Sequence, residues 1–433
     1  SRPPTFKSAG EVVGTMTDFS RRSVVRRLGA GLALSAGGAA AVTTAGDSDA
    51  TDDTSRDDAS ADGTSTDDAS TDSAPTYLYD AANTGVTDAA GPTESPSELW
   101  STTVGDAVFA PPAVGGGFCY LTTGDGRLRA VDTEAGDPVW TVEGDRGLLT
   151  TPAVNTDGVY LANENRIVRS LTREAGDVQW SIGTIARGGG ACAPALANDL
   201  LYTAGADGLV HAFDSSTGTP HWELRLPEAV LTSLAVDGET AYVAAGRTVY
   251  AVDATRADAD ARTEIAGRLV PVTREPAWQT TLEPRIGTAL TVRDDRLIVG
   301  TDDGVTALNP ENGNVQWQVS TRTPVLGSPA FTTDRLLVPT ALGDLVALDP
   351  ENGEESWRAR VGEKLDTPPV VADGVGYLAT RNGSLLAFAP EDGSVQWRLD
   401  REDGTPTAPV AVGGRLYLAD WNGTLTAFGT QGN

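Results

Sequence analysis

Short runs of alternating apolar and polar residues, separated by turns that contain glycine, fill the chain from about residue 98 onward. In one such unit the strand-like runs are 368–372, 375–380, 385–389 and 395–399, and the turns between them hold Asp373-Gly374, Asn382-Gly383 and Glu391-Asp392-Gly393. Asn-Gly and Asp-Gly supply the positive φ angles that tight hairpins need, and alternation with a period of two suits a pleated strand. The pattern therefore predicts a unit of four antiparallel strands.

Tryptophan marks the period of this unit. The tryptophans in phase are Trp100, Trp140, Trp180, Trp222, Trp278, Trp317, Trp357 and Trp397, with gaps of 40, 40, 42, 56, 39, 40 and 40 residues. Four strands every 40 residues or so are typical of one blade of a β-propeller. We therefore predict eight blades, and the ninth tryptophan, Trp421, lies out of phase.

The first strand of most units begins at a proline, at Pro112, Pro152, Pro194, Pro329, Pro368 and Pro409. A strand edge that faces the propeller axis tolerates a residue without an N–H, so these strands are expected to be innermost. Leu234 and Ala289 replace the proline in the other two units.

The two ends of the repeat region complement each other. The last unit, residues 407–428, supplies three strands and no tryptophan strand, whereas residues 98–104 around Trp100 form a single strand before the first unit. Pairing the two would complete the eighth blade and remove an exposed sheet edge. The predicted fold is all-β: an eight-bladed β-propeller of four-stranded antiparallel blades, closed by an N-terminal strand.

The unit Ala-x-Asp-x-x-x-Gly-x-x-x-Trp, as in Ala347 to Trp357, resembles the tryptophan-docking repeat of the pyrroloquinoline quinone (PQQ)-like β-propeller family. That family includes quinone enzymes and the non-enzymatic propeller of the bacterial outer-membrane protein assembly machinery. The resemblance covers about residues 98–433. It implies that the eight tryptophans in phase are structural and pack between neighbouring blades.

The N-terminal region differs in composition. Residues 1–45 resemble a twin-arginine export signal: Met16 is the expected start, and Arg21-Arg22 precede a small-residue apolar stretch that is too short and weak for a membrane span. No cysteine follows to carry a lipid, which leaves free secretion or an uncleaved N-terminal anchor. Residues 46–75, rich in Asp, Ser and Thr, are expected to be a disordered tether, and residues 76–433 the propeller. These features predict an extracytoplasmic protein, secreted or associated with the cell surface.

The formal net charge is -28, and Lys7 and Lys364 are the only lysines. Such an acidic, lysine-poor composition suggests a halophilic, specifically haloarchaeal, source, because high salt screens repulsion between carboxylates. It argues against a nucleic-acid partner, which needs a basic surface.

The quinone-dependent dehydrogenases that share the repeat use adjacent cysteines near the cofactor and a calcium ion held by Glu, Asn and Asp. Here Cys119 and Cys192 fall in different units, and we expect two buried, unpaired thiols. We therefore predict no catalytic residue, no metal site and no cofactor, with PQQ and calcium as the alternative.

Two further features offer metal-binding residue types. His211 and His221 are the only histidines and are expected on strand surfaces. Hairpin chemistry explains the Asp-Gly turns at Asp125, Asp207, Asp303 and Asp373 without calcium.

Basic residues recur in the segments that join one unit to the next: Arg146, Arg187, Arg285, Arg322 and Lys364. These connections emerge on one propeller face, so the residues form a candidate face for an anionic ligand or acidic peptide. The alternative is unrelated surface charges. An insertion at residues 254–277 is expected to project from the opposite face, and Asn382 and Asn422 are candidate glycosylation sites.

These observations favour a non-catalytic, monomeric propeller scaffold that binds a protein or a cell-surface polymer. Two alternatives stay open: a PQQ-dependent dehydrogenase-like oxidoreductase, and a sensor of small anionic ligands.

Overall fold

The structure is a computed structural model that describes residues 73–144, 149–162, 167–183, 192–258, 263–265, 268–362, 364–401 and 405–430. The chain divides into two compact units, Ser1–Asp67 and Asp68–Asn433, and every described residue belongs to the second. The expected export signal and all but the last three residues of the expected tether lie outside the described part. The described residues form strands and turns, and none of them forms a helix that could cross a membrane.

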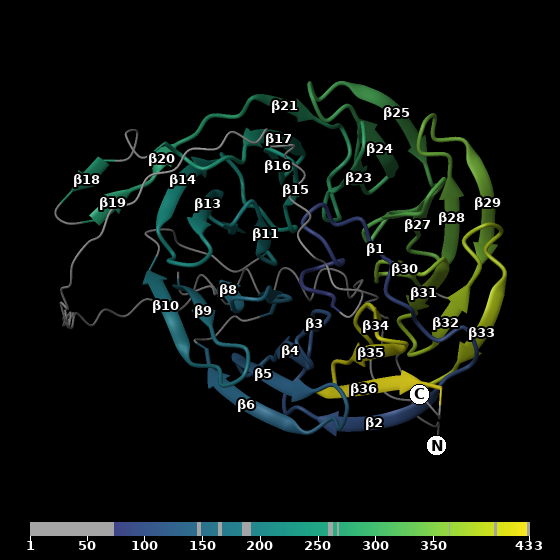
Figure 1. The fold of residues 1–433 in the computed structure, drawn as a ribbon. Coiled ribbons are helices and arrows are strands. Elements are labelled where there is room, and N and C mark those ends of the chain that lie inside the picture. Colours follow the sequence, from purple (N-terminus) through teal and green to yellow (C-terminus); the bar gives the residue numbers. More distant parts are fainter. Residues whose placement is uncertain are drawn as a thin grey trace, which may run out of the picture. The chain divides into compact units, whose positions relative to one another are not determined.

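The strands form eight four-stranded antiparallel sheets arranged as the blades of a ring (Figure 1). Blade 1 contains β3 (Ala113–Gly115), β4 (Phe118–Thr122), β5 (Arg127–Asp132) and β6 (Pro138–Glu143). Blade 2 contains β7 (Ala153–Val154), β8 (Val159–Ala162), β9 (Ile167–Leu171) and β10 (Val178–Gly183). Blade 3 contains β11 (Ala195–Ala197), β12 (Leu200–Ala204), β13 (Leu209–Asp214) and β14 (Pro220–Arg225). Blade 4 contains β15 (Ala235–Asp237), β16 (Thr240–Ala245), β17 (Thr248–Asp253) and β21 (Trp278–Thr281).

The second half of the ring repeats this plan. Blade 5 contains β22 (Thr291–Arg293), β23 (Arg296–Gly300), β24 (Gly304–Leu308) and β25 (Val315–Ser320). Blade 6 contains β26 (Ala330–Phe331), β27 (Leu336–Pro339), β28 (Asp344–Leu348) and β29 (Glu355–Arg360). Blade 7 contains β30 (Val370–Ala372), β31 (Val375–Ala379), β32 (Leu385–Phe388) and β33 (Val395–Leu399). Blade 8 contains β34 (Val410–Val412), β35 (Arg415–Ala419), β36 (Thr424–Gly429) and, from the start of the repeat region, β2 (Ser97–Thr103).

The closure of the ring confirms the prediction from the sequence. β2 pairs antiparallel with β36, with Trp100 opposite Ala427, so the N-terminal strand supplies the outermost strand of blade 8. In each blade the first strand is innermost and its residues are largely buried, which agrees with the proline positions. The four strands of blade 7 match the runs read from residues 368–399.

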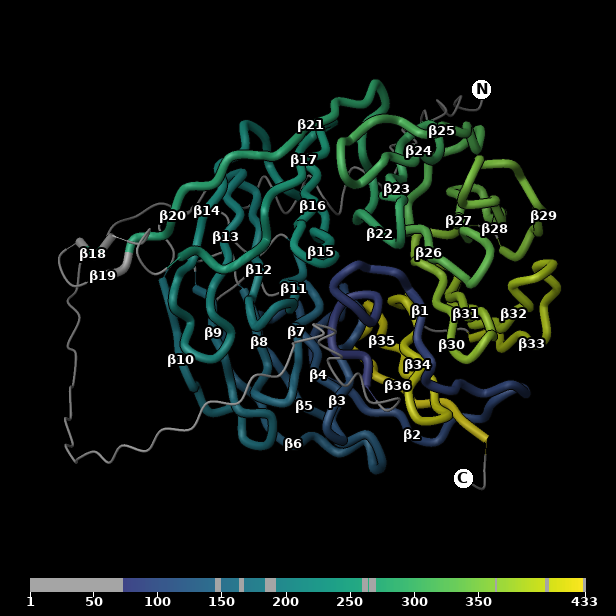
Figure 2. The backbone as a smooth tube through the Cα atoms, turned by 45° about the horizontal axis from the view of Figure 1, so that its top comes forward, coloured from purple at the N-terminus to yellow at the C-terminus, as the bar shows by residue number. Residues whose placement is uncertain are grey.

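Residues 73–91 run through the middle of the ring, where Figures 1 and 2 show them in purple. They include β1 (Val86–Thr87), which pairs parallel with β30. Backbone N–H groups of the innermost strands donate to this segment, for example Val154 to Pro75 at 2.7 Å, Val236 to Ala81 at 2.7 Å and Val371 to Gly85 at 2.8 Å. Ala74 and Pro75, the last residues of the expected tether, bond to blades 1 and 2.

Each repeat tryptophan lies against the following blade. Its indole N–H donates to a backbone carbonyl there, and the pairs are Trp100–Thr133, Trp140–Arg173, Trp180–Ser215, Trp222–Thr255, Trp278–Pro310, Trp317–Pro350, Trp357–Pro390 and Trp397–Pro92, at 2.8–3.2 Å. A Cβ placed on the turn glycine Gly136 would lie 2.5 Å from the Trp100 ring. We propose from these contacts that the eight tryptophans dock each blade onto the next.

The insertion in blade 4 lies at the outer rim of blade 3 instead of projecting from a face. It contains the hairpin of β18 (Thr263–Ile265) and β19 (Arg268–Val270), followed by β20 (Val272–Thr273). β20 pairs parallel with β14, with Val272 opposite Trp222. The open edge of β14 offers unpaired backbone groups, and pairing with them holds the insertion at the rim.

Candidate binding face

The two faces of the ring carry different kinds of turn, because neighbouring strands in a blade are antiparallel. One face holds the second-to-third-strand turns, such as 380–384 and 420–423, and the connections between blades, such as 104–112. We call it the connection face. The other face holds the first-to-second and third-to-fourth turns, such as 373–374, and we call it the hairpin face.

The structure places three of the five candidate basic residues on the connection face. Arg285 and Arg322 are exposed, and Lys364 is half-buried with its Nζ 3.9 Å from Asp366 Oδ2. No ion pair or hydrogen bond between described residues joins these three basic residues to one another. Arg146 and Arg187 lie outside the described residues.

Two aromatic side chains that the repeat does not explain stand exposed on this face. Phe109 is 45% exposed and Trp421 is 37% exposed. Their ring centroids lie 5.6 Å apart with the planes tilted by 58°. Because aromatic rings this large are usually buried in a monomer, the pair marks a surface that differs from the rest of the face.

The loop that carries Phe109 is held between two turns. Val108 N–H donates to the Asp420 carbonyl of blade 8 at 3.1 Å, and Gly124 N–H of blade 1 donates to the Ala107 carbonyl at 2.8 Å. A Cβ on Gly124 would lie 3.3 Å from the Phe109 ring, so the small residue lets the ring lie close to the turn. Backbone hydrogen bonds therefore hold the aromatic pair in place at the junction of blades 8 and 1, where the propeller closes.

Arg381 extends the aromatic pair. Its guanidinium carbon lies 5.8 Å from the centre of the Trp421 ring, which is the geometry of a cation–π contact. Arg381 Nη1 donates to Asp366 Oδ2 at 2.5 Å, and the Arg381 backbone N–H donates to the Lys364 carbonyl at 3.2 Å. Phe109, Trp421 and Arg381, which we call the stacked platform, thus join blades 1, 8 and 7.

Basic side chains lie beside the stacked platform. Lys364 and Arg381 share the carboxylate of Asp366. Arg401 lies 3.7 Å from the buried carboxylate of Asp420, which also accepts backbone N–H groups of its own turn. Burial, and then the charge of Arg381, lower the pKa of Lys364 below its usual value. The platform is therefore bordered by basic side chains that are paired with Asp366 and Asp420.

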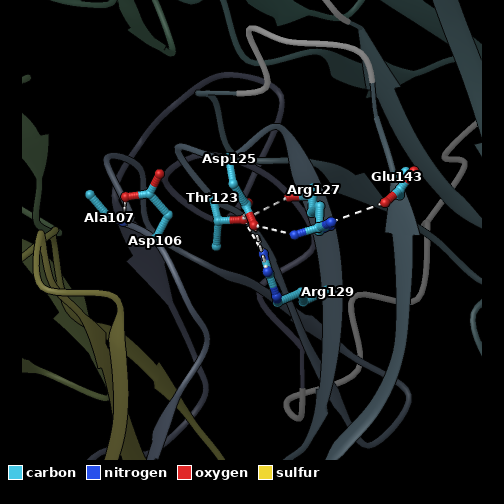
Figure 3. Close-up of polar contacts among 7 residues, drawn as sticks. All are labelled: Asp106, Ala107, Thr123, Asp125, Arg127, Arg129 and Glu143. Atoms are coloured by element: carbon cyan, nitrogen blue, oxygen red, sulfur yellow. Dashed lines mark hydrogen bonds and ion pairs between the residues drawn. The ribbon is translucent and has the colours of Figure 1, made fainter.

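A second polar network supports the blade 1 side of this face, and Figure 3 shows it around Asp125. Arg127 Nη1 and Arg129 Nη2 each donate to Asp125 Oδ2 at 2.8 Å, and Arg127 Nη2 donates to Glu143 Oε1 at 3.0 Å. Hydrogen bonding, chiefly from Arg129, holds the pKa of Asp125 far below its usual value. The charged groups of this network pair with one another and stabilise the turn at Asp125. They are therefore less available to a ligand than the stacked platform is.

The cysteines agree with the sequence expectation, whereas the histidines do not. Cys119 and Cys192 are both buried, and burial raises the pKa of the Cys119 thiol. The expectation of surface histidines is wrong: His211 and His221 are both buried. His211 stacks on Phe213 with centroids 5.6 Å apart, and the insertion covers the strand that carries His221. Burial lowers the pKa of His211 to about 4.

The described residues contain no group of three His, Cys, Asp or Glu side chains arranged to hold a metal ion. At the Asp-Gly turn of blade 7, Asp373 has φ 45° and Gly374 has φ 76°. These angles are those of a tight hairpin turn, as the sequence predicted.

The two glycosylation candidates flank the stacked platform. Asn382 follows Arg381, Asn422 follows Trp421, and both asparagines are exposed. Trp421 lies out of phase with the eight repeat tryptophans. That departure from phase, in an exposed turn that carries polar residues in most other blades, was the signal that could have identified the platform.

The fold defines the protein as an eight-bladed PQQ-like β-propeller. A profile of the family described as outer membrane protein assembly factor BamB matches residues 90–187, 164–260, 261–326 and 301–433. The chain belongs to this family.

Solved structures with the same fold include BamB and dehydrogenases. BamB from Moraxella catarrhalis is 15% identical, with a TM-score of 0.60 over 78% of this chain and 99% of that one. The quinohemoprotein alcohol dehydrogenase of Comamonas testosteroni is 14% identical, with a TM-score of 0.64 over 85% of this chain and 82% of that one. A europium-containing methanol dehydrogenase is 12% identical, with a TM-score of 0.63 over 84% and 99%. At these identities the likeness shows the fold alone, and no curated protein sequence matches the chain.

Proposed function

We propose that this protein is a non-catalytic, extracytoplasmic propeller scaffold that binds a partner protein through its connection face. The observation that carries the proposal is the exposure of large apolar side chains on turns and connections of that face. Phe109, Leu342 and Trp421 are 45%, 56% and 37% exposed, and they belong to turns and connections of blades 1, 6 and 8.

The other exposed apolar residues are distributed differently. Val139, Val178, Val315 and Val395 each stand near the start of an outermost strand, one to a blade, and Val270 lies in the insertion. Single exposed valines are ordinary on a soluble protein, whereas large apolar side chains exposed on one face, two of them in ring contact, are typical of an interaction site. The distribution thus favours the connection face over the rim as the binding surface.

Two sequence features support the location and class of this function. Arg21-Arg22 before an apolar stretch support export, and family membership places the chain with a protein described as an assembly factor. A partner protein fits these features better than a cell-surface polymer, because the exposed residues are Phe, Leu and Trp, and large aromatic residues are enriched at protein interfaces.

Site-specific crosslinking tests the proposal. A photo-crosslinking amino acid at position 342 should capture a defined partner protein on intact source cells, and the same amino acid at position 315 on the rim should capture none. Equal capture from both positions, or no capture from position 342, would overturn the proposal.

A PQQ-dependent oxidoreductase is the second candidate, because quinone enzymes are among the structural neighbours. Adding PQQ and calcium to the purified protein separates the two functions. Stoichiometric binding of the quinone with alcohol-dependent dye reduction would establish the enzyme, and we expect neither.

The third candidate, a sensor of small anions, draws on Arg285 and Arg322, which are exposed on neighbouring connections. Calorimetry with small carboxylates on the protein and on an Arg285→Ala/Arg322→Ala variant should show the same heats if the scaffold proposal is correct.

A further inference from the structure

The stacked platform offers two kinds of contact side by side. The Phe109 and Trp421 rings present exposed aromatic surface, and Arg381 covers one side of the Trp421 ring. Tryptophan and arginine dominate the energetics of many protein interfaces when they stand next to each other on a rigid backbone. The hydrogen bonds of Val108 and Gly124 supply that rigidity for the loop of Phe109.

The charges around the platform select among possible partners. Lys364 and Arg381 share the carboxylate of Asp366, and Arg401 lies beside that of Asp420. Arg381 uses Nη1 for Asp366, whereas a guanidinium carries five N–H donors. A carboxylate that approached beside Trp421 would therefore meet guanidinium N–H donors of Arg381 that Asp366 does not use.

The charge of the whole molecule limits how acidic the partner can be. With a net charge of -28, the protein repels strongly acidic chains at long range. A short segment with one carboxylate beside an apolar side chain satisfies both conditions, because it gains the local pairing and avoids much of the general repulsion.

We propose that Phe109, Trp421 and Arg381 recognise an extended peptide segment of the partner protein that carries an aromatic or proline side chain directly beside an aspartate or glutamate. The flat side chain packs on the two rings, and the carboxylate pairs with Arg381 and its cationic neighbours. This inference rests on the proposed function, since it names what the connection face binds.

Selection from a random dodecapeptide phage library against the full-length protein tests the inference. We expect enriched peptides to contain Trp, Tyr, Phe or Pro next to Asp or Glu. Synthetic copies of the enriched peptides should bind Trp421→Ala and Arg381→Gln at least about ten-fold more weakly, as expected for removal of an anchoring side chain. Val315→Ala, which truncates an exposed apolar residue at the rim, is the matched control and should leave binding unchanged.

Two further variants separate recognition from folding. Trp421→Phe keeps a flat ring and should retain most of the affinity for the peptides. A peptide in which Lys replaces the acidic residue should bind the wild-type protein no more tightly than it binds Arg381→Gln. Melting curves for every variant show whether the fold is intact.

The inference is overturned if no peptide is enriched, if the enriched peptides lack an acidic residue, or if they bind Trp421→Ala as well as the wild type. Specific binding of a neutral oligosaccharide that depends on Trp421 would also overturn it, because the platform would then bind sugar rings instead of peptide side chains. Capture of a partner from position 342, combined with a failed peptide selection, would leave the scaffold proposal standing and reject only this recognition chemistry.

Discussion

The hairpin face and the connection face are built from the same repeat, yet they differ in how much of their apolar surface is covered. Toward the hairpin face, residues 73–91 line the innermost strands and bond to the first-to-second-strand turns, for example Gly414 N–H to the Ala90 carbonyl at 2.9 Å. On the connection face, Phe109, Leu342 and Trp421 are exposed. The chain thus covers the inner edges of its blades with its own segment and leaves apolar rings exposed at the other end.

The carboxylates of the two regions differ in the same way. Asp80 in the axial segment accepts the backbone N–H of Thr84 at 2.9 Å and has no cationic partner among the described residues, and its burial raises its pKa. Asp125 on the connection face is held by Arg127 and Arg129, which keep its pKa low. The comparison indicates that the axial segment, residues 73–91, stabilises the fold through packing and backbone hydrogen bonds, whereas the connection face is stabilised through networks of charged side chains.

The largest expected effect comes from removing the axial segment. Deleting residues 1–89 retains Pro92 and β2 but removes the bonds from the innermost strands and the buried side chains of Leu78 and Tyr79. Each lost hydrogen bond costs about 1 kcal/mol, and burial adds to this, so the loss should be on the order of 5 kcal/mol or more. Thermal melting should fall by roughly 10 °C relative to a deletion of residues 1–72. Equal melting temperatures would show that the segment is dispensable.

A single side chain tests the same region more finely. The buried Asn83 amide donates to the carbonyls of Leu234 in blade 4 and Leu290 in blade 5, both at 2.9 Å. Asn83→Ala leaves both buried acceptors without this donor, which should lower the free energy of unfolding by about 2–4 kcal/mol. Denaturant unfolding measures this. Asn382→Ala, an exposed asparagine on the connection face, is the control and should stay near the wild type.

The two carboxylates should respond to pH in opposite directions. The raised pKa of folded Asp80 favours the folded state when the group is protonated, and this stabilisation is lost as the pH rises above the unfolded pKa of about 4. Asp80→Asn should therefore gain stability relative to wild type between pH 4 and pH 7. The lowered pKa of Asp125 has the opposite sign, so Asp125→Asn should be most destabilising at pH 7 and less so as the pH falls toward 3. Denaturant unfolding across this range checks both, and parallel curves would contradict the assignment.

The smallest expected effect on stability comes from the stacked platform itself. Trp421→Ala removes a half-exposed ring and should change the free energy of unfolding by less than about 1 kcal/mol. Trp317→Ala, which removes an almost fully buried ring between blades, should cost about 3–5 kcal/mol in the same measurement. Similar losses at the two positions would mean that Trp421 is also a structural residue.

Much of the fold was predictable because the repeat depends on patterns of residues that lie close together in the sequence. The tryptophan spacing predicted eight blades, and the single strand around Trp100 predicted the closure that β2 and β36 make. Less of the candidate face was predictable. The position of Lys364 in a connection was visible in the sequence, but its pairing with Arg381 through Asp366 was not, because the two basic residues come together only in the folded ring.

By itself, the sequence determined the strand periods, the number of blades and the strand that closes them, because each depends on hydrophobic alternation and turn residues within about 40 positions. Only the tertiary structure decided where the non-repeating residues lie. Asn83 meets Leu234 and Leu290, and Phe109 meets Trp421, across separations of 151, 207 and 312 residues. Such contacts depend on how the closed ring brings distant turns and the N-terminal segment together, and no local pattern encodes that placement.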